Sequence, residues 1–247
     1  MSSFASTLTL AFTFTFTPAH ADAALRYVHH AADVRTLSSS DPSLASNELA
    51  RDVDSGVELR LEYFPRGVLT TSKVPIESAC YVLEGELKTN SGTKVGPGDL
   101  AWFRSAGMAL NSRKPALLLV VRRPLEGSSR GEGAVLARNV KPLSIAGGKG
   151  SVQLLVDGVP IKTYAVDALT ADSGVTIPSH RHETSAEMIY VLSGKGTTVI
   201  NGESLRVAQG DAVYIPKMME HSLVVDEKIT AVQVYAPAGP EQRFKRE

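Results

Sequence analysis

The chain has 247 residues, of which 43% are hydrophobic and 21% charged, an ordinary composition for a globular protein with room for one large or two small domains. Its 26 basic and 26 acidic side chains cancel, so the sequence lacks the basic surface typical of a nucleic-acid-binding protein. The single cysteine, Cys80, excludes an internal disulfide and a thiolate metal cluster, and we expect it to be a buried, inert thiol.

Residues 1–24 differ in composition from the rest of the chain. They contain no Lys or Arg, and an apolar, Thr-rich run leads to Ala19-His20-Ala21, the small-x-small pattern of a signal-peptidase site. We therefore expect a cleaved signal peptide, or else a disordered N-terminus, and a secreted or periplasmic protein. Without cleavage the protein would be cytoplasmic. The alternation FTFTFT also fits a half-buried strand, and the run is too short and too polar to span a membrane.

From residue 25 onward the pattern predicts strands. Short apolar or alternating runs such as GVELRLEYF, ALLLVVRR and EMIYVLSG recur, and Gly, Asn, Asp and Pro separate them. Asn201-Gly202 predicts a type I′ hairpin, because both residues tolerate a positive φ. No amphipathic stretch is long enough to form a dominant helix. The expected fold class is all-β, as an antiparallel barrel or sandwich.

The sequence also contains an internal repeat. YVLEGEL at 81–87 matches YVLSGKG at 190–196, and GPGDLAWF at 96–103 matches AQGDAVYI at 208–215. We expect two related domains, at 25–125 and 151–247. The segment between them, 126–150, is rich in Gly, Ser and charged residues and is interpreted as a linker with some irregular structure.

Three of the six histidines and one glutamate form a candidate metal site in the second half. His180 and His182 are two residues apart in an extended segment, which points both imidazoles to the same face. Glu187 follows a polar turn at the start of the next predicted strand. His221 lies beyond a proline turn, at the start of another strand.

At these positions the sequence resembles the cupin family. The first cupin motif is matched without departure by Gly174, His180, His182, Glu187 and Gly194. The second motif is matched by Gly210, Pro216 and His221, with Met218 where the family usually has glycine. The resemblance implies two tandem cupin barrels (the double-stranded β-helix or jelly-roll fold) and a metal held by His180, His182, Glu187 and His221. Met218 implies a slightly different local backbone, with its thioether lining the pocket.

The corresponding positions in the first half carry no set of metal-binding residues. Aligning the YVL repeats places Thr71, Lys73 and Ser78 opposite the first three ligands, whereas aligning Gly67 on Gly174 gives Lys73, Pro75 and Cys80. Ala109 stands opposite His221. Neither alignment yields a ligand set, so the chain resembles a bicupin with a metal-free N-terminal barrel.

Three imidazole nitrogens and one carboxylate suit a divalent transition metal, with Mn or Fe preferred and Ni, Co or Zn as alternatives. The resemblance implies an enzyme that acts on a small oxygenated molecule, first a dioxygenase of the quercetinase type, with Glu187 as a candidate catalytic base. The alternatives are a non-redox isomerase or decarboxylase and a non-catalytic binding or sensing cupin. Oxalate-type decarboxylation in bicupins typically comes with ligands in both barrels, which argues against it here. The family also implies a homodimer formed through edge strands.

Other side chains of the predicted strands are candidates for the pocket or for packing around it. Tyr164 and Gln233 lie on predicted strands of the second half and could reach the metal. Trp102, Tyr190 and Tyr214 are interpreted as packing residues, and Glu220 as a charge that faces solvent.

Overall fold

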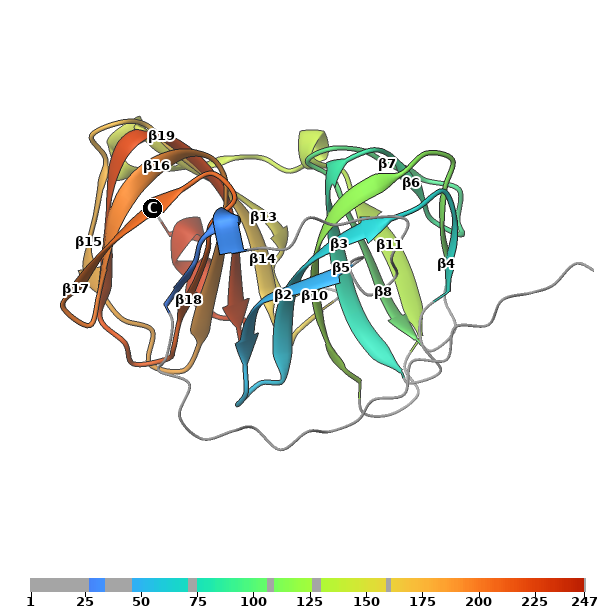
Figure 1. The fold of residues 1–247 in the computed structure, drawn as a ribbon, viewed down its shortest axis with the longest axis horizontal. Coiled ribbons are helices and arrows are strands. Elements are labelled where there is room, and N and C mark those ends of the chain that lie inside the picture. Colours follow the sequence, from blue (N-terminus) through green and yellow to red (C-terminus); the bar gives the residue numbers. More distant parts are fainter. Residues whose placement is uncertain are drawn as a thin grey trace, which may run out of the picture.

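The computed structural model of the protein describes residues 27–33, 46–70, 75–105, 109–125, 130–158 and 161–246. The predicted signal segment 1–24 and Lys73 lie outside these residues. Figure 1 shows two barrels side by side, the first drawn in blue to green and the second in yellow to red. No helix in the described part of the chain is both long and apolar enough to cross a membrane.

The first barrel consists of a six-stranded and a four-stranded antiparallel sheet, in the strand orders β11-β8-β5-β10-β3-β2 and β4-β9-β6-β7. Its strands are β2 (Ser46–Asp52), β3 (Val57–Phe64), β4 (Gly67–Thr70), β5 (Ile76–Glu84), β6 (Leu87–Lys88), β7 (Lys94–Val95), β8 (Leu100–Ser105), β9 (Ala109–Ser112), β10 (Ala116–Pro124) and β11 (Gly131–Val135).

The second barrel follows the order β1-β18-β16-β19-β14-β13-β12, with β15 paired to β19 and β17 paired to β16. Its strands are β12 (Leu143–Ile145), β13 (Gly150–Val156), β14 (Ala165–Ala171), β15 (Thr176–His180), β16 (Ala186–Ile200), β17 (Glu203–Ala208), β18 (Ala212–Ile215) and β19 (His221–Ala236), joined by β1 (Val28–His29). The 3₁₀ helices are η1 (Ala31–Asp33), η3 (Ala137–Asn139), η4 (Ala146–Gly148) and η5 (Pro240–Lys245). The predicted all-β fold of two tandem barrels is confirmed.

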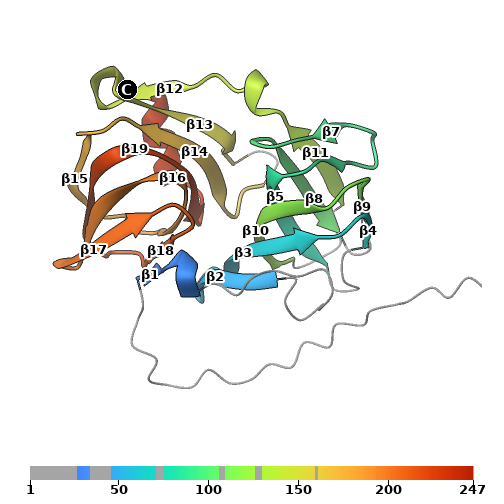
Figure 2. The same cartoon turned by 45° about the horizontal axis from the view of Figure 1, so that its top comes forward.

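The chain crosses between the barrels at both ends of the first one. β1 pairs with β18 of the second barrel before the chain enters the first, as Figure 2 shows. In the segment that was interpreted as a linker, β11 pairs with β8 of the first barrel and β12 pairs with β13 of the second. The segment thus contributes a strand to each barrel, while the exact domain boundaries stay a prediction.

One of the hydrophobic clusters contains residues of both barrels. Because side chains alternate along a strand, β10 directs Leu119 and Val121 toward the second barrel and Leu118 and Val120 into the first. Residues from both halves therefore pack in a single buried cluster, and Tyr164 of the second half lies in it with none of its surface exposed. This shared core holds the metal-site barrel and the first barrel together.

The repeated YVLxG sequence has a steric explanation. Gly85 and Gly194 both adopt a positive φ, of 86° and 83°. A Cβ atom at Gly85 would lie 2.5 Å from the carbonyl oxygen of Pro115, and one at Gly194 would lie 2.0 Å from that of Lys228. At both positions a neighbouring strand passes too close for any side chain, so each barrel requires glycine there.

Two turns beside the site have positive φ angles. Asn201 and Gly202 have φ angles of 51° and 81°, which confirms the predicted type I′ hairpin. Met218 has a φ of 65° and so keeps the left-handed backbone that glycine favours. Its side chain is 51% exposed. The expectation that its thioether lines the pocket is wrong, because this backbone turns the side chain toward solvent.

Candidate metal centre

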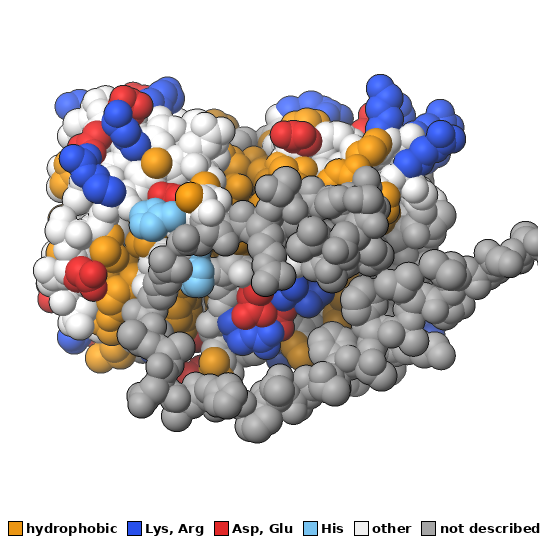
Figure 3. Space-filling view, in the orientation of Figure 1, with side chains coloured by type: hydrophobic (Ala, Val, Ile, Leu, Met, Phe, Trp, Pro, Cys, Tyr) orange, Lys and Arg blue, Asp and Glu red, His pale blue; other side chains and the backbone are white. Residues whose placement is uncertain are grey.

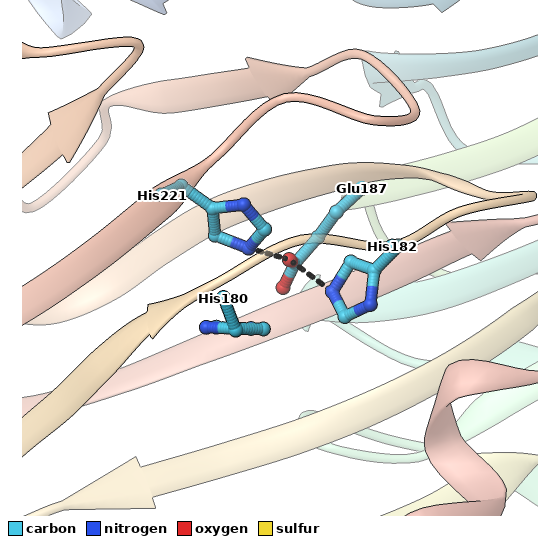
Figure 4. Close-up of side chains that lie close together, drawn as sticks. All are labelled: His180, His182, Glu187 and His221. Atoms are coloured by element: carbon cyan, nitrogen blue, oxygen red, sulfur yellow. Dashed lines mark hydrogen bonds and ion pairs between the residues drawn. The ribbon is translucent and has the colours of Figure 1, made fainter.

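The end of one strand and the starts of two others bring the four predicted ligands together, as Figure 4 shows. His180 is the last residue of β15, and His182 lies in the turn that follows. Glu187 is the second residue of β16, and His221 is the first of β19. His180 and His221 stand directly opposite each other in the β15–β19 pair. Arg181, between the two histidines, is exposed, as the alternation of the extended chain predicts.

The four side chains form a compact cluster. One nitrogen from each histidine and one Glu187 oxygen all lie within 4.8 Å of one another. Glu187 Oε2 is 3.2 Å from His182 Nε2 and 3.1 Å from His221 Nε2. His182, Glu187 and His221 are buried, and His180 is partly exposed. A single small cation at the centre could contact all four residues.

Backbone carbonyls fix the orientation of two of the imidazoles. His180 Nδ1 lies 2.9 Å from the carbonyl oxygen of Pro178, and His221 Nδ1 lies 2.9 Å from that of Met219. Since a carbonyl only accepts, each Nδ1 is a protonated donor, which leaves Nε2 of each ring as the atom that would bind a metal once it carries no proton. His180 Nε2 is buried and has no hydrogen-bond partner among the described residues. Such an orphaned acceptor fits a metal ligand.

The electrostatics of the cluster favour a cation. Burial by itself would raise the pKa of Glu187, but hydrogen bonds with His182 and His221 outweigh burial and hold that pKa well below its usual range. Burial lowers the pKa of His180, whereas for His221 the Glu187 carboxylate overcomes burial and raises the pKa. Glu187 is therefore an anion that needs a positive partner, and the ligand nitrogens must lose protons before a metal binds.

Gln233 supports the carboxylate from the opposite side. Its Nε2 donates a hydrogen bond of 2.9 Å to Glu187 Oε1, so Oε2 is left to face the imidazoles. The hypothesis that Gln233 reaches the site is thus correct, whereas Tyr164 lies in the core between the barrels and not in the pocket. Glu220 is exposed, as expected, and accepts a hydrogen bond from Ser179.

An apolar cavity of about 70 Å³ lies beside the cluster. His180, Glu187 and His221 form part of its wall, and most of the remainder is aliphatic. The polar exceptions are Thr198, Ser222, Gln233 and Arg243. One water molecule needs about 10–15 Å³ of such space, so the cavity accepts a ligand with a handful of non-hydrogen atoms.

The first barrel has no comparable cluster among its described residues. Ser78, which the YVL alignment places opposite Glu187, is buried and donates its hydroxyl to the carbonyl of Val121. Next to it, Arg122 pairs with Glu58 at 3.1 Å, and Arg60 pairs with Glu58 at 3.3 Å. Figure 3 shows acidic and basic side chains grouped where β2 and β3 lie. Ion pairs between its own side chains thus lie beside Ser78, because Arg122 stands directly opposite Ser78 in the β5–β10 pair.

The interior of the first barrel is otherwise apolar. Cys80 packs there with Val82 and Val120 and is 1% exposed. Burial raises the pKa of this thiol, so it stays protonated. The prediction of a buried, inert cysteine is confirmed.

Asp167 is a buried carboxyl that the sequence analysis missed. It lies on β14 directly opposite Gln233, is fully buried, and neither of its oxygens has a hydrogen-bond partner among the described residues. Burial, reinforced by the Glu241 and Glu187 carboxylates, raises its pKa well above the usual value. Asp167 is therefore neutral over a wider pH range in the folded protein than in the unfolded chain.

This shift makes the stability of the protein depend on pH. The contribution of neutral Asp167 is complete below the pKa of the unfolded chain and is lost as the pH rises through the higher folded-state pKa. We expect Asp167→Asn, which cannot ionise, to raise the free energy of unfolding by about 1–2 kcal/mol at alkaline pH, and by less at acidic pH. Urea unfolding in the presence of a chelator measures this difference.

Asp172, whose side chain is half exposed and pairs with Lys228 at 2.9 Å, provides the control. Asp172→Asn should change the free energy of unfolding by less than about 1 kcal/mol with no such pH trend. Parallel pH profiles for the wild type and Asp167→Asn would show that Asp167 is already ionised in the folded protein.

Comparisons with known proteins agree with this geometry. Residues 169–235 match the family described as Cupin domain. An uncharacterized protein of Methanocaldococcus jannaschii is 39% identical over 44 residues, which span 18% of this chain and 35% of that protein. The chain thus matches about a third of that relative's length.

Among solved structures, a mutant of Bacillus subtilis oxalate decarboxylase superposes with a TM-score of 0.58 and 16% identity, over 74% of this chain and 70% of that one. Salicylate 1,2-dioxygenase from Pseudaminobacter salicylatoxidans superposes with a TM-score of 0.56 and 13% identity, over 74% of this chain and 71% of that one. At these identities the likeness establishes the fold alone.

Proposed function

The chain is a bicupin of the cupin superfamily, and on this premise we propose that its second barrel is a metal-dependent enzyme centre for a small oxygenated organic molecule. The observation that carries the proposal is the convergence of three imidazole nitrogens and one carboxylate oxygen within 4.8 Å beside an apolar cavity. A structural site would not need such a cavity next to its ligands.

The donor set defines the metal that we propose. His180, His182 and His221 supply neutral nitrogens and Glu187 supplies one anionic oxygen, a combination that suits Mn or Fe, with Ni, Co or Zn as alternatives. A metal held by these four residues would act as a Lewis acid on a substrate oxygen. Gln233 keeps the Glu187 carboxylate in its orientation.

We assign two roles to Glu187. It is first a ligand, because the low pKa that the two histidines impose keeps it ionised. It is also the candidate catalytic base, because it lines the cavity and can reach a substrate proton there. The apolar wall excludes bulk water, which strengthens each charge interaction inside the cavity.

Oxidation by dioxygen is the first reaction that we propose, with the fold of salicylate 1,2-dioxygenase in support. A non-redox isomerisation or decarboxylation is the second, with the fold of oxalate decarboxylase in support. A binding or sensing protein without turnover is the third. We further propose export by way of residues 1–24 and a homodimer formed through edge strands, both on the sequence pattern and the family resemblance.

Oxygen uptake separates these reactions. We expect metal-loaded protein to consume oxygen with at least one member of a panel of small phenols, hydroxy acids and keto acids, and His221→Ala to lose that uptake by more than about 100-fold. Product formed without oxygen uptake would indicate the non-redox reaction. Tight binding of a panel compound without product would indicate a binding or sensing protein. Oxygen uptake that is unchanged in His221→Ala would refute the proposed metal site.

A further inference from the structure

The C-terminal helix η5 closes one side of the metal cavity. Figure 1 shows it as the short red helix packed against the second barrel, where Phe244 joins a buried cluster with Ile145 and Leu169. Arg243, the residue before Phe244, lines the same cavity as His180, Glu187 and His221. A segment beyond the last strand thus places one basic side chain next to the metal ligands.

The charge of Arg243 has no acidic partner among the described residues. The other charged residues of η5 are satisfied elsewhere: Lys245 pairs with Asp157 at 2.8 Å, and Glu241 accepts hydrogen bonds from Gly239 and Gln242. The guanidinium instead lies over the Phe244 ring, 4.7 Å from its centroid. This contact orients the side chain and leaves its five N–H donors available.

The charge acts on the cavity itself. Arg243 lies close enough to His180, His221 and Asp167 for its charge to act on all three side chains. The Asp167 carboxyl has no hydrogen-bond partner among the described residues, so it does not pair with Arg243. Glu187 is engaged by the histidines and Gln233. The cavity wall therefore contains one guanidinium that pairs with no carboxylate among the described residues.

We propose that Arg243 binds the carboxylate of the substrate, so that the enzyme centre acts on small organic carboxylates. The planar guanidinium pairs with a carboxylate through two parallel hydrogen bonds, and this pairing is strong where apolar walls exclude water. A single unpaired guanidinium matches the single charge of a carboxylate better than the double charge of a phosphate. The remainder of the substrate would lie against Ile145, Leu169 and Phe244 and direct a second oxygen toward the metal ligands. This inference rests on the proposed function.

Pyruvate and pyruvamide test the proposal, because they have the same number of non-hydrogen atoms and differ in charge. Water-proton relaxation of Mn(II)-loaded protein measures the binding of each probe. We expect the wild type to bind pyruvate at least about 10-fold more tightly than pyruvamide, Arg243→Gln to lose this preference, and Arg243→Lys to keep part of it. Pyruvamide should bind the three proteins equally.

Arg246→Gln is the matched control, since Arg246 lies on the same C-terminal segment but is exposed. It should behave as the wild type. Equal binding of the two probes by the wild type would overturn the inference, because the site would then have no preference for a carboxylate. A preference for pyruvate that survives in Arg243→Gln would also overturn it, because the metal alone would then account for carboxylate binding. Metal content is measured on the same samples. If only this inference fails, the wild type still retains Mn(II); if the proposed function fails, the wild type itself does not retain Mn(II).

Discussion

Replacing His180 and His182 together with alanine is expected to remove the metal from the protein, with a loss of affinity of more than about 100-fold. Two of the three nitrogens that face Glu187 Oε2 would be lost, and the remaining His221 and Glu187 are too few to hold a transition metal tightly. Elemental analysis after gel filtration measures the metal, and circular dichroism reports the fold. The first barrel should stay folded, because its own apolar cluster contains neither histidine.

His30 offers a control for this double variant. It lies on the same barrel, pairs with Asp211 at 3.2 Å, and is outside the four-residue cluster. His30→Ala should therefore retain the metal content of the wild type. Stoichiometric metal that survives the double change would mean that the site lies elsewhere in the chain.

Replacing Gly194 with alanine is expected to destabilise the second barrel by more than about 3 kcal/mol. Gly194 has a φ of 83°, and its new Cβ would lie 2.0 Å from the carbonyl oxygen of Lys228, well inside van der Waals contact. Because that oxygen belongs to the backbone of β19, the whole strand must move. β19 also carries His221 and Gln233, so metal affinity should fall together with stability.

Gly202 provides a control that separates the clash of a new Cβ atom from the cost of a positive φ for alanine. Its φ of 81° is nearly the same, but a Cβ there would meet nothing within 4 Å. Gly202→Ala should therefore cost only about 1–2 kcal/mol, the price of a left-handed alanine. Urea unfolding of both variants measures the difference. Equal destabilisation of the two variants would show that the close approach of Lys228 does not cause the loss of stability in Gly194→Ala.

The metal ligands could be predicted from the sequence because short-range geometry determines them. The alternation of an extended chain brings His180 and His182 to one side, and turns at fixed spacing place Glu187 and His221 at strand starts. The repeat predicted two barrels because the same steric demand for glycine recurs at Gly85 and Gly194.

Other features depend on contacts between distant segments, which no local pattern encodes. Arg243 follows the last strand in an irregular sequence, and only the packing of Phe244 brings it to the cavity. Asp167 lies between strands β13 and β19, and Glu241 of η5 is close enough for its charge to act on the Asp167 carboxyl. The sequence leaves Tyr164 as a candidate for the pocket, but it lies just before β14 and packs in the hydrophobic cluster between the barrels.

The most direct test of the central claim is the metal content of the wild-type protein, purified under metal-replete conditions and analysed for all first-row transition elements. Four residues that converge on one point predict close to one transition-metal ion per chain, retained through gel filtration. Protein that emerges free of transition metal, and that binds none on titration with Mn(II) or Fe(II), would contradict a metal centre in the second barrel.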